Sequence, residues 1–171
     1  MKSNLKHQSN DPNCKGVESL SIGSELLLGN IVNTNAQWIS EELSHLGLNH
    51  FRQSTIGDNS ERIIKLIREI SLRSNLLITT GGLGPTPDDL TTESIAKTFN
   101  ATLSEREYLW DQIKTKLSSS GSTFNKSSLK KQCFFPKDAQ IINNPRGTAP
   151  GMIWKPIEGC LLYTSPSPRD S

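Results

Sequence analysis

A glycine-rich loop between an apolar run and a helical pattern constrains this chain more than any other feature. The apolar run is Leu76–Ile78, the loop contains Gly81, Gly82 and Gly84, and a helix pattern follows over 90–99. Glycines at a strand end let backbone N–H groups approach an anion, because no Cβ blocks them. The N-terminus of the next helix adds positive potential. This order of elements indicates an α/β fold with a phosphate or nucleotide site.

The rest of the chain also alternates short strands with amphipathic helices. The patterns predict strands over 17–22, 49–56, 75–79 and 139–143, a return strand from Met152, and helices over 34–46, 90–99 and 125–132. Two further helices are expected after possible capping boxes, Asp58 with Glu61 and Ser104 with Glu107. Such alternation predicts α/β layers with a largely parallel sheet, whose ligands bind outside the carboxyl ends of the strands. The loop of residues 23–25 should therefore lie beside the glycine loop.

Several apolar and polar stretches have simpler interpretations. Residues 1–15 are polar and predict a disordered lead-in, and residues 118–123 predict a flexible connection. The Leu26–Leu28 run is expected in the core. Each of the three tryptophans is expected in the core or at an interface: Trp38, Trp110 and Trp154.

Size and charge exclude several classes of protein. The chain has 171 residues, enough for one domain, with 19 basic and 17 acidic residues and a net charge of +2. No basic stripe supports nucleic-acid binding, and no apolar run is long enough to span a membrane. The three cysteines form no Cys-x-x-Cys pair and the N-terminus lacks a signal peptide, so free thiols and a cytoplasmic location are expected.

Two adjacent carboxylates after the glycine loop predict a metal site. Asp88 and Asp89 could hold Mg²⁺ or a similar divalent cation against phosphate oxygens. Asp89 could instead cap the helix that follows. Glu25 could be a second ligand, a general base, or a residue in a cap or salt bridge. Asp58 fits a helix cap better than a catalyst.

Five ordered motifs within residues 17–157 resemble the N-terminal domain of the competence/damage-inducible CinA family, which belongs to the molybdopterin-binding, MoaB/MogA-like superfamily. The motifs are the segments 23–29, 31–36, 57–59, 80–91 and 144–151. The last reads Asn-Pro-Arg-Gly-Thr-Ala-Pro-Gly. Because all five occur in order, the resemblance is far more specific than a single glycine-rich turn.

The resemblance implies a three-layer α/β/α fold with a mostly parallel mixed sheet. It also implies a pocket formed by the loops at 23–25, 81–84 and 144–151, and relatives that form homo-oligomers. In CinA-type proteins this domain is linked to hydrolysis of the pyrophosphate in ADP-ribose-like nucleotides. A separate domain carries nicotinamide mononucleotide deamidase activity, and no part of this chain resembles it.

We therefore interpret the chain as a metal-dependent pyrophosphatase of a small nucleotide. Asp88, Asp89 and Glu25 are the expected catalytic residues. The expected substrate-binding residues are Gly81, Gly82, Gly84, Thr86, Asn33, Asn144, Gly147 and Thr148. Asn33 and Asn35 precede a helix and could cap it, and Arg146 is either a phosphate ligand or a solvated residue. The alternative is a non-catalytic domain that binds molybdopterin or a nucleotide; a purely structural domain fits the clustered glycine loops poorly.

The end of the chain departs from the family pattern. A Pro-Gly-x-Pro-Ser-Glu-Met loop is expected there, but residues 160–170 read Cys-Leu-Leu-Tyr-Thr-Ser-Pro-Ser-Pro-Arg-Asp. Their back-translation matches a transposase-type sequencing adapter, whereas the other interpretation is a natural Ser/Pro-rich tail. We therefore expect the domain to span 16–159, truncated at its C-terminal end, and 160–171 to be non-native. A missing strand would leave an unpaired strand edge and exposed apolar surface.

Overall fold

In the computed structural model, the residues described are 16–120 and 126–166. The predicted lead-in at 1–15, part of the predicted connection at 118–123 and the last five residues lie outside this range. The strands are β1 Val17–Ile22, β2 His50–Ile56, β3 Leu76–Thr80, β4 Leu103–Glu105, β5 Phe134–Pro136, β6 Gln140–Ile142, β7 Gly151–Ile157 and β8 Cys160–Ser165. The helices are α1 Ser24–Leu27, α2 Thr34–His45, α3 Ser60–Arg73, α4 Thr91–Thr98, α5 Glu107–Ser120 and α6 Lys126–Lys130, followed by the 3₁₀ turn η1 Lys131–Cys133.

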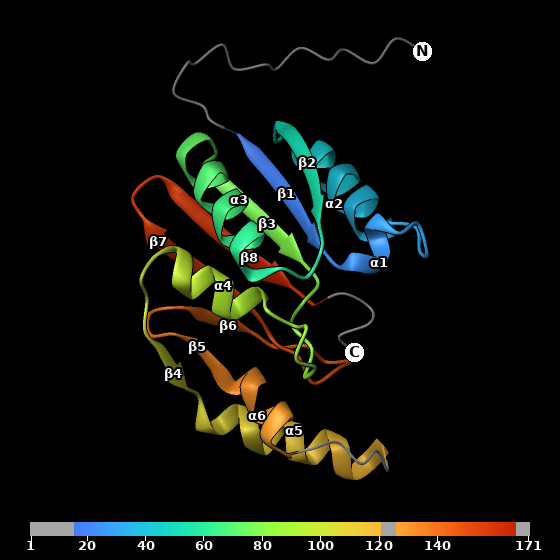
Figure 1. Cartoon of the computed structure of the whole chain (residues 1–171), viewed down its shortest axis with the longest axis vertical. Coiled ribbons are helices and arrows are strands. Elements are labelled where there is room, and N and C mark those ends of the chain that lie inside the picture. The colour runs from blue at the N-terminus through green and yellow to red at the C-terminus, as the bar shows by residue number, and fades with distance from the viewer. Residues whose placement is uncertain (1–15, 121–125, 167–171) are drawn as a thin grey trace.

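Six strands form one mixed sheet in the order β2-β1-β3-β8-β7-β6. The pairs β1–β2, β1–β3 and β3–β8 are parallel, and β7 pairs antiparallel with both β8 and β6. Figure 1 shows α3 and α4 in front of the sheet and α2 beside β2, while β4, β5, α5 and α6 form a unit at the lower end. This is the predicted three-layer α/β/α fold with a mostly parallel sheet.

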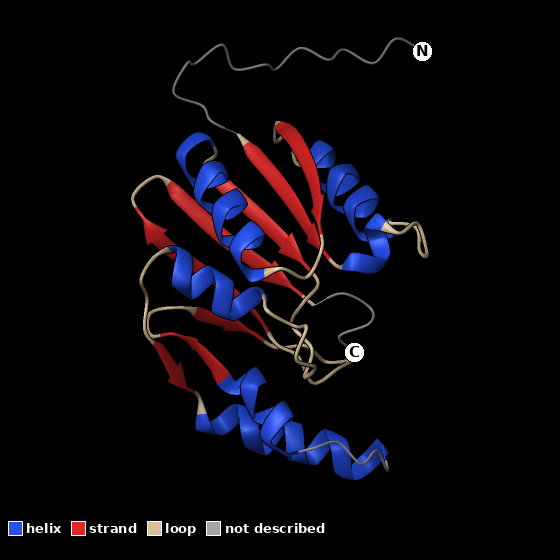
Figure 2. Ribbon diagram, viewed as in Figure 1, coloured by secondary structure: helices blue, strands red, loops and turns tan. Residues whose placement is uncertain are grey.

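Successive side chains of a strand point to opposite faces of the sheet, and this explains why helices cover both faces (Figure 2). Leu20, Ile22 and Leu77 face α3 and α4 in the larger core, which includes the buried stripe of Ile63 and Ile67. Residues of the opposite parity, Val17 with Leu76 and Ile78, pack against Ile39 and Leu43 of α2. Because successive strand side chains point to opposite faces, β1 and β3 bury apolar groups on both sides.

Some apolar residues lie elsewhere than predicted. The segment containing Leu26–Leu28 forms the short helix α1 and its end, and the side chains of Leu27 and Leu28 are exposed. Trp38 is exposed and therefore lies outside the core, so its predicted place at an interface stays a prediction, whereas Trp154 is buried as predicted, against Phe99 in an edge-to-face ring contact. The predicted core position of Leu26–Leu28 is therefore wrong for Leu27 and Leu28. It failed because an isolated apolar run does not reveal which side of a one-turn helix faces the sheet.

The capping predictions also need correction. Asn59, not Asp58, caps α3 by accepting a hydrogen bond from the backbone N–H of Arg62 (3.0 Å). Ser104 lies in β4 and donates to the carbonyl of Phe135 instead of opening α5. Both positions satisfy the capping-box spacing, but the side chain of Asp58 accepts from Ser24 and that of Ser104 donates to Phe135, so neither caps a helix.

Residues 160–165, which the sequence assigns to a non-native tail, form β8 in the middle of the sheet. β8 pairs with β3 from Leu161 to Ser165, and with β7 through the turn that contains Gly159. Leu162 and Thr164 are buried. The unpaired strand edge expected from a missing strand is a prediction about a chain without this segment; with the segment present, β8 pairs with β3 and β7. The proposed adapter origin of this segment concerns the DNA and stays a prediction.

Candidate functional site

The loops after β1 and β3 meet at the carboxyl ends of these adjacent strands, as predicted. They surround a hollow of about 340 Å³. Its lining includes four carboxylates and the glycine loop: Glu25, Asp58, Asp88 and Asp89 with Gly81, Gly82, Gly84 and Thr86, beside Ile22 and Pro85. We refer to it as the carboxylate hollow. All three predicted catalytic residues and four of the predicted substrate-binding residues therefore lie around one space.

The glycine loop needs its glycines because its backbone turns tightly against neighbouring elements. Gly81 and Gly82 have φ angles of +88° and +67°. A Cβ on Gly81 would lie 2.2 Å from the carbonyl oxygen of Ile22, and one on Gly82 would lie 2.3 Å from Thr91 Oγ1. Thr91 ties the loop to α4 by donating from its Oγ1 to the Gly81 carbonyl (2.8 Å) and from its N–H to the Gly82 carbonyl (3.1 Å).

Asp89 closes the far end of this loop. Its Oδ2 accepts hydrogen bonds from Thr86 N (2.8 Å) and Thr86 Oγ1 (2.6 Å). The alternative cap role is wrong, because Leu90 is the N-cap of α4 and no side chain bonds there. Asp88 is exposed and directs no bond to the loop among the described contacts. Asp88 is thus available to a ligand, while one oxygen of Asp89 is held by Thr86.

On the opposite side of the hollow, Asp58 joins the end of β2 to the start of α1. Asp58 Oδ2 accepts from the backbone N–H of Ser24 (2.8 Å), and Ser24 Oγ accepts from the N–H of Asp58 (3.1 Å). This reciprocal pair fixes the start of α1, the helix that carries Glu25. Asp58 is therefore a positioning residue for α1, and Glu25 is the partly buried carboxylate beside it.

Asp88 and Asp89 are the residues that could hold the divalent cation expected from the sequence, and the cation itself stays a prediction. No group of three or more acidic, His or Cys side chains among the described residues is arranged to enclose a metal. Mg²⁺ does not require such a cage, since it is commonly held by one or two carboxylates plus waters and substrate phosphates. Asp88 and the free oxygen of Asp89 meet that description.

Asn33 lies beside the carboxylate hollow in a smaller hollow of about 170 Å³, which shares Ile22, Glu25 and Gly81 with it. The side chain of Asn33 accepts from the N–H of Ala36 (3.2 Å), so it caps α2, and it donates to Ser21 Oγ (2.8 Å). Asn35 lines the same smaller hollow. Asn33 therefore caps α2 and also lines the smaller hollow, with its Oδ1 and its Nδ2 both bonded within the protein.

The loop of residues 144–150 is built around Asn144, but it does not enter the carboxylate hollow. Asn144 Oδ1 accepts from the N–H groups of Arg146 (3.0 Å) and Gly147 (3.1 Å), and Nδ2 donates to the Ala149 carbonyl (3.1 Å). Lys116 of α5 donates to the carbonyls of Asn144 and Gly147. Neither Gly147 nor Thr148 is among the described residues that line the hollow.

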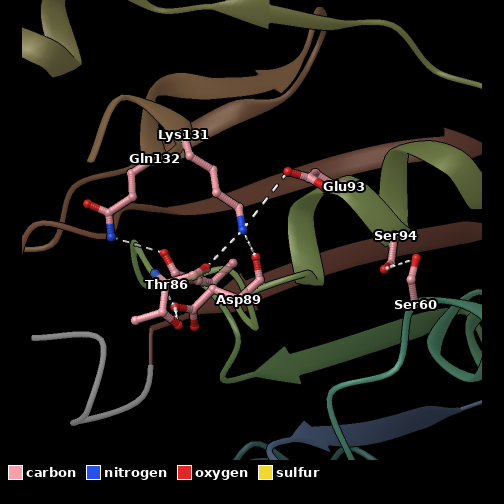
Figure 3. Close-up of polar contacts among 8 residues, drawn as sticks. Ser60, Thr86, Asp89, Glu93, Ser94, Lys131 and Gln132 are labelled. Carbon is pink, nitrogen blue, oxygen red and sulfur yellow. Dashed lines mark hydrogen bonds and ion pairs between the residues drawn. The ribbon is translucent and has the colours of Figure 1, made fainter. Parts of the chain in front are cut away.

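Two residues that the sequence did not single out hold the glycine loop from the other side. Lys131 Nζ donates to the carbonyls of Thr86 and Asp89 and lies 4.0 Å from Glu93 Oε1. Gln132 donates from Nε2 to the Leu83 carbonyl at 3.1 Å (Figure 3). Both come from η1, more than forty residues away along the chain. A Lys-Gln pair after a lysine-rich helix gives no local signal of this role.

The sequence matches the "Probable molybdopterin binding domain" family model over residues 18–171. A CinA-like protein of Prochlorococcus marinus subsp. pastoris is 89% identical over 166 residues, which are 97% of this chain and 38% of that protein. A CinA-like protein of Synechococcus is 54% identical over 151 residues, which are 88% of this chain and 36% of that protein.

The chain belongs to the CinA-like proteins. It spans about two fifths of the length of these curated relatives. Among solved structures, the CinA protein of Thermoplasma acidophilum, whose function is described as unknown, superimposes with a TM-score of 0.81 at 31% identity and 92% coverage of both chains. The MoaB molybdopterin biosynthesis enzyme of Thermus thermophilus matches with a TM-score of 0.54 at 20% identity, over 90% of this chain and 82% of that one. This second likeness supports the fold alone.

Among the described residues no helix is long and apolar enough to cross a bilayer.

Proposed function

We propose that this CinA-like domain binds a nucleotide and hydrolyses its pyrophosphate with the help of a divalent metal, the substrate being ADP-ribose-like. The observation that carries the proposal is the carboxylate hollow. Four acidic side chains and the backbone of three glycines surround one space at the carboxyl ends of β1 and β3. Carboxylates alone would repel a phosphate, so a cation between the two is the arrangement that this lining favours.

In this proposal each part of the hollow has a separate task. Asp88 and Asp89 would hold the Mg²⁺, which when bound would supply positive charge against the phosphates and lower the pKa of a water. The backbone N–H groups of Gly82 and Gly84 face the phosphate oxygens, and Thr86, whose N–H and hydroxyl both donate to Asp89, holds the end of the loop in place. Glu25 accepts the proton of the attacking water. The water oxygen then bonds to one phosphorus, the bridging P–O bond breaks, and two monophosphates leave.

Asp88→Asn tests the hydrolase without disturbing the loop, because Asp88 is exposed whereas Asp89 holds Thr86. Purified protein is incubated with ADP-ribose and Mg²⁺, and AMP is quantified by chromatography. We expect Asp88→Asn to lower turnover at least ~100-fold while ADP-ribose still binds. The matched control is Asp138→Asn, an exposed aspartate in the turn between β5 and β6, which should keep full activity.

The second candidate function is binding of molybdopterin or a nucleotide without turnover. The match to a molybdopterin-binding family and the bond between Asp89 and Thr86, which gives this carboxylate a structural task, favour it. A wild-type protein that binds ADP-ribose or a pterin saturably, but forms no AMP with Mg²⁺, Mn²⁺ or Co²⁺, would support this function over the hydrolase.

A further inference from the structure

The two adjacent aspartates of the carboxylate hollow lie on one four-residue turn, residues 86–89. The N–H of Asp89 donates to the Thr86 carbonyl (3.1 Å), and Pro87 occupies the second position, which proline favours in such turns. The carboxylate of Asp89 in turn accepts from the N–H (2.8 Å) and the Oγ1 (2.6 Å) of Thr86. These three bonds hold Asp88 and Asp89 in one rigid unit, but they do not attach that unit to the rest of the domain.

Lys131 attaches the 86–89 turn to a distant part of the chain. Its Nζ donates to the carbonyl of Thr86 (3.2 Å) and to the carbonyl of Asp89, which are the two ends of the turn. Glu93 Oε1, on the first turn of α4, lies 4.0 Å from the same nitrogen (Figure 3). Only 25% of the Lys131 side chain is exposed. Hydrogen bonds from an ammonium group are stronger than neutral ones, so this contact is well suited to anchor the turn.

A shift of the anchored turn would move the carboxylates across the hollow. Asp89 lies against the glycine loop, since a Cβ on Gly84 would be 2.6 Å from Asp89 Oδ2. Gly84, Asp88 and Asp89 all line the hollow, whereas Lys131 is not among the described residues that line it. Mg²⁺ demands near-ideal octahedral geometry, so its affinity is sensitive to small displacements of the groups that hold it. Lys131 can therefore affect a cation only through the turn or through its charge.

The charge of Lys131 alone would act in the opposite direction from the anchor. An ammonium repels a second cation, so removal of this charge by itself would strengthen cation binding. Loss of the anchor would weaken it, because the two carboxylates would no longer be held in place. The two effects differ in sign, and a measured affinity separates them.

We propose that Lys131 is a positioning residue for the divalent cation, acting through the backbone of the 86–89 turn that carries Asp88 and Asp89. This inference rests on the proposed function for the cation, but it concerns affinity for the metal and not the hydrolysis. It gives the contact between η1 and the glycine loop a task at the site: the unit that contains η1 determines how well the turn is prepared for a cation.

The test measures binding of Mn²⁺ without substrate, from the loss of the electron paramagnetic resonance signal of the free ion. Lys131→Ala is compared with wild type and with Lys130→Ala, the neighbouring lysine, which pairs with Glu105 at 2.9 Å. Asp88→Asn shows whether the bound ion is the one at the turn. Lys131→Ala is also titrated with n-propylammonium, which replaces the atoms that the substitution removes. Tetramethylammonium at the same concentration is the control for ionic strength, because it carries no N–H donor.

The dissociation constant for Mn²⁺ should rise about 10- to 100-fold in Lys131→Ala, as for other groups that orient metal ligands. It should stay within about twofold of wild type in Lys130→Ala. n-Propylammonium should recover at least about fivefold of the lost affinity, and tetramethylammonium should recover none. If Lys131→Ala binds Mn²⁺ as tightly as wild type or more tightly, or if the two alkylammonium ions act alike, the inference is overturned.

Circular dichroism first establishes that Lys131→Ala is folded. If it is not, Lys131→Met replaces it with Lys130→Met as control, and an equal affinity of these two variants for Mn²⁺ overturns the inference. A wild-type protein that binds no Mn²⁺, or binds it independently of Asp88, overturns both the inference and the metal site of the proposed function. A protein whose Mn²⁺ affinity depends on Lys131 but that forms no AMP from ADP-ribose refutes the hydrolase alone.

Discussion

A buried ion pair far from the site shows how single residues stabilise this fold. Glu18 of β1 is 3% exposed and accepts from Arg73 Nε (2.7 Å), Arg73 Nη2 (2.8 Å) and Ser74 Oγ (2.6 Å). Burial alone would raise the pKa of Glu18, but these hydrogen bonds and the charges of Arg73 and Arg52 outweigh it and leave the pKa below its ordinary 4.5. The pair therefore joins the end of α3 to the central strand β1.

Replacing Arg73 with methionine should lower the free energy of unfolding by about 3 kcal/mol, because it leaves a buried carboxylate with Ser74 alone. Urea denaturation at pH 7 measures this loss. Arg68→Met is the control, because Arg68 is exposed on the same helix. The free energy of unfolding of this variant should be within about 0.5 kcal/mol of wild type. A similar stability for the two variants would mean that the pair contributes nothing measurable.

The same pair predicts how stability depends on pH. Because the pKa of folded Glu18 is lowered, the unfolded chain binds more protons as the pH falls below about 4.5. The contribution of Glu18 is therefore fully present above that pH and is lost in acid. The difference in unfolding free energy between wild type and Arg73→Met should accordingly shrink as the pH is lowered from 6 toward 3.

At the scale of elements, the glycine loop depends on close contact with β1. Gly81→Ala would place a methyl group against the backbone carbonyl of Ile22, in addition to the strain of a φ of +88°. Gly29→Ala is a matched control, because Gly29 has a φ of +71° but no atom within 4 Å of an added Cβ. We expect Gly29→Ala to cost about 1–2 kcal/mol of stability. Gly81→Ala should cost more and also abolish AMP binding; equal effects in thermal melts and titrations would contradict this.

The elements that the sequence predicts well carry strong local signals. The buried stripe of α3 and the apolar strands β1 and β3 follow from periodicity, and the left-handed Gly47 marks the end of α2. The strands β4 and β5 are missed because they pair with each other across about thirty residues of the chain. Long-range pairing leaves no local trace in the sequence.

The same distinction applies to the candidate site. The meeting of Glu25 with Asp88 and Asp89 is predictable, since ends of adjacent parallel strands converge at one edge. The contacts of Lys131 and Gln132 with the glycine loop are not, because they depend on how η1 packs against it. The predicted place of Thr148 in the pocket stays a prediction, as do the homo-oligomer and the metal.

At the scale of the whole molecule, β8 decides whether the domain has one sheet or two. It lies between β3 and β7, and no described strand other than β8 pairs with β3 on that side. The side chains of Cys160 and Leu162 are both buried, the latter in the same core as Leu20 and Ile63. The domain boundary that we predict at residue 159 therefore removes a central strand from the structure, whatever the origin of the residues that form it.

A chain that ends at Gly159 should consequently lose cooperative unfolding. Without β8 the sheet separates into β2-β1-β3 and β7-β6, and both new edges expose apolar groups and unpaired backbone. The lost burial and backbone pairing should remove much of the free energy of unfolding, which is ~5–15 kcal/mol for a typical domain. Differential scanning calorimetry would show no sharp transition, and the protein should bind a dye for exposed apolar surface.

Deletion of residues 2–15 is the matched control, because the sequence predicts a lead-in that precedes β1, and the melting temperature of this variant should equal that of the full chain. If the chain ending at Gly159 melts as sharply and at the same temperature, the sheet does not need β8, and the boundary predicted from the sequence is that of an independently stable domain.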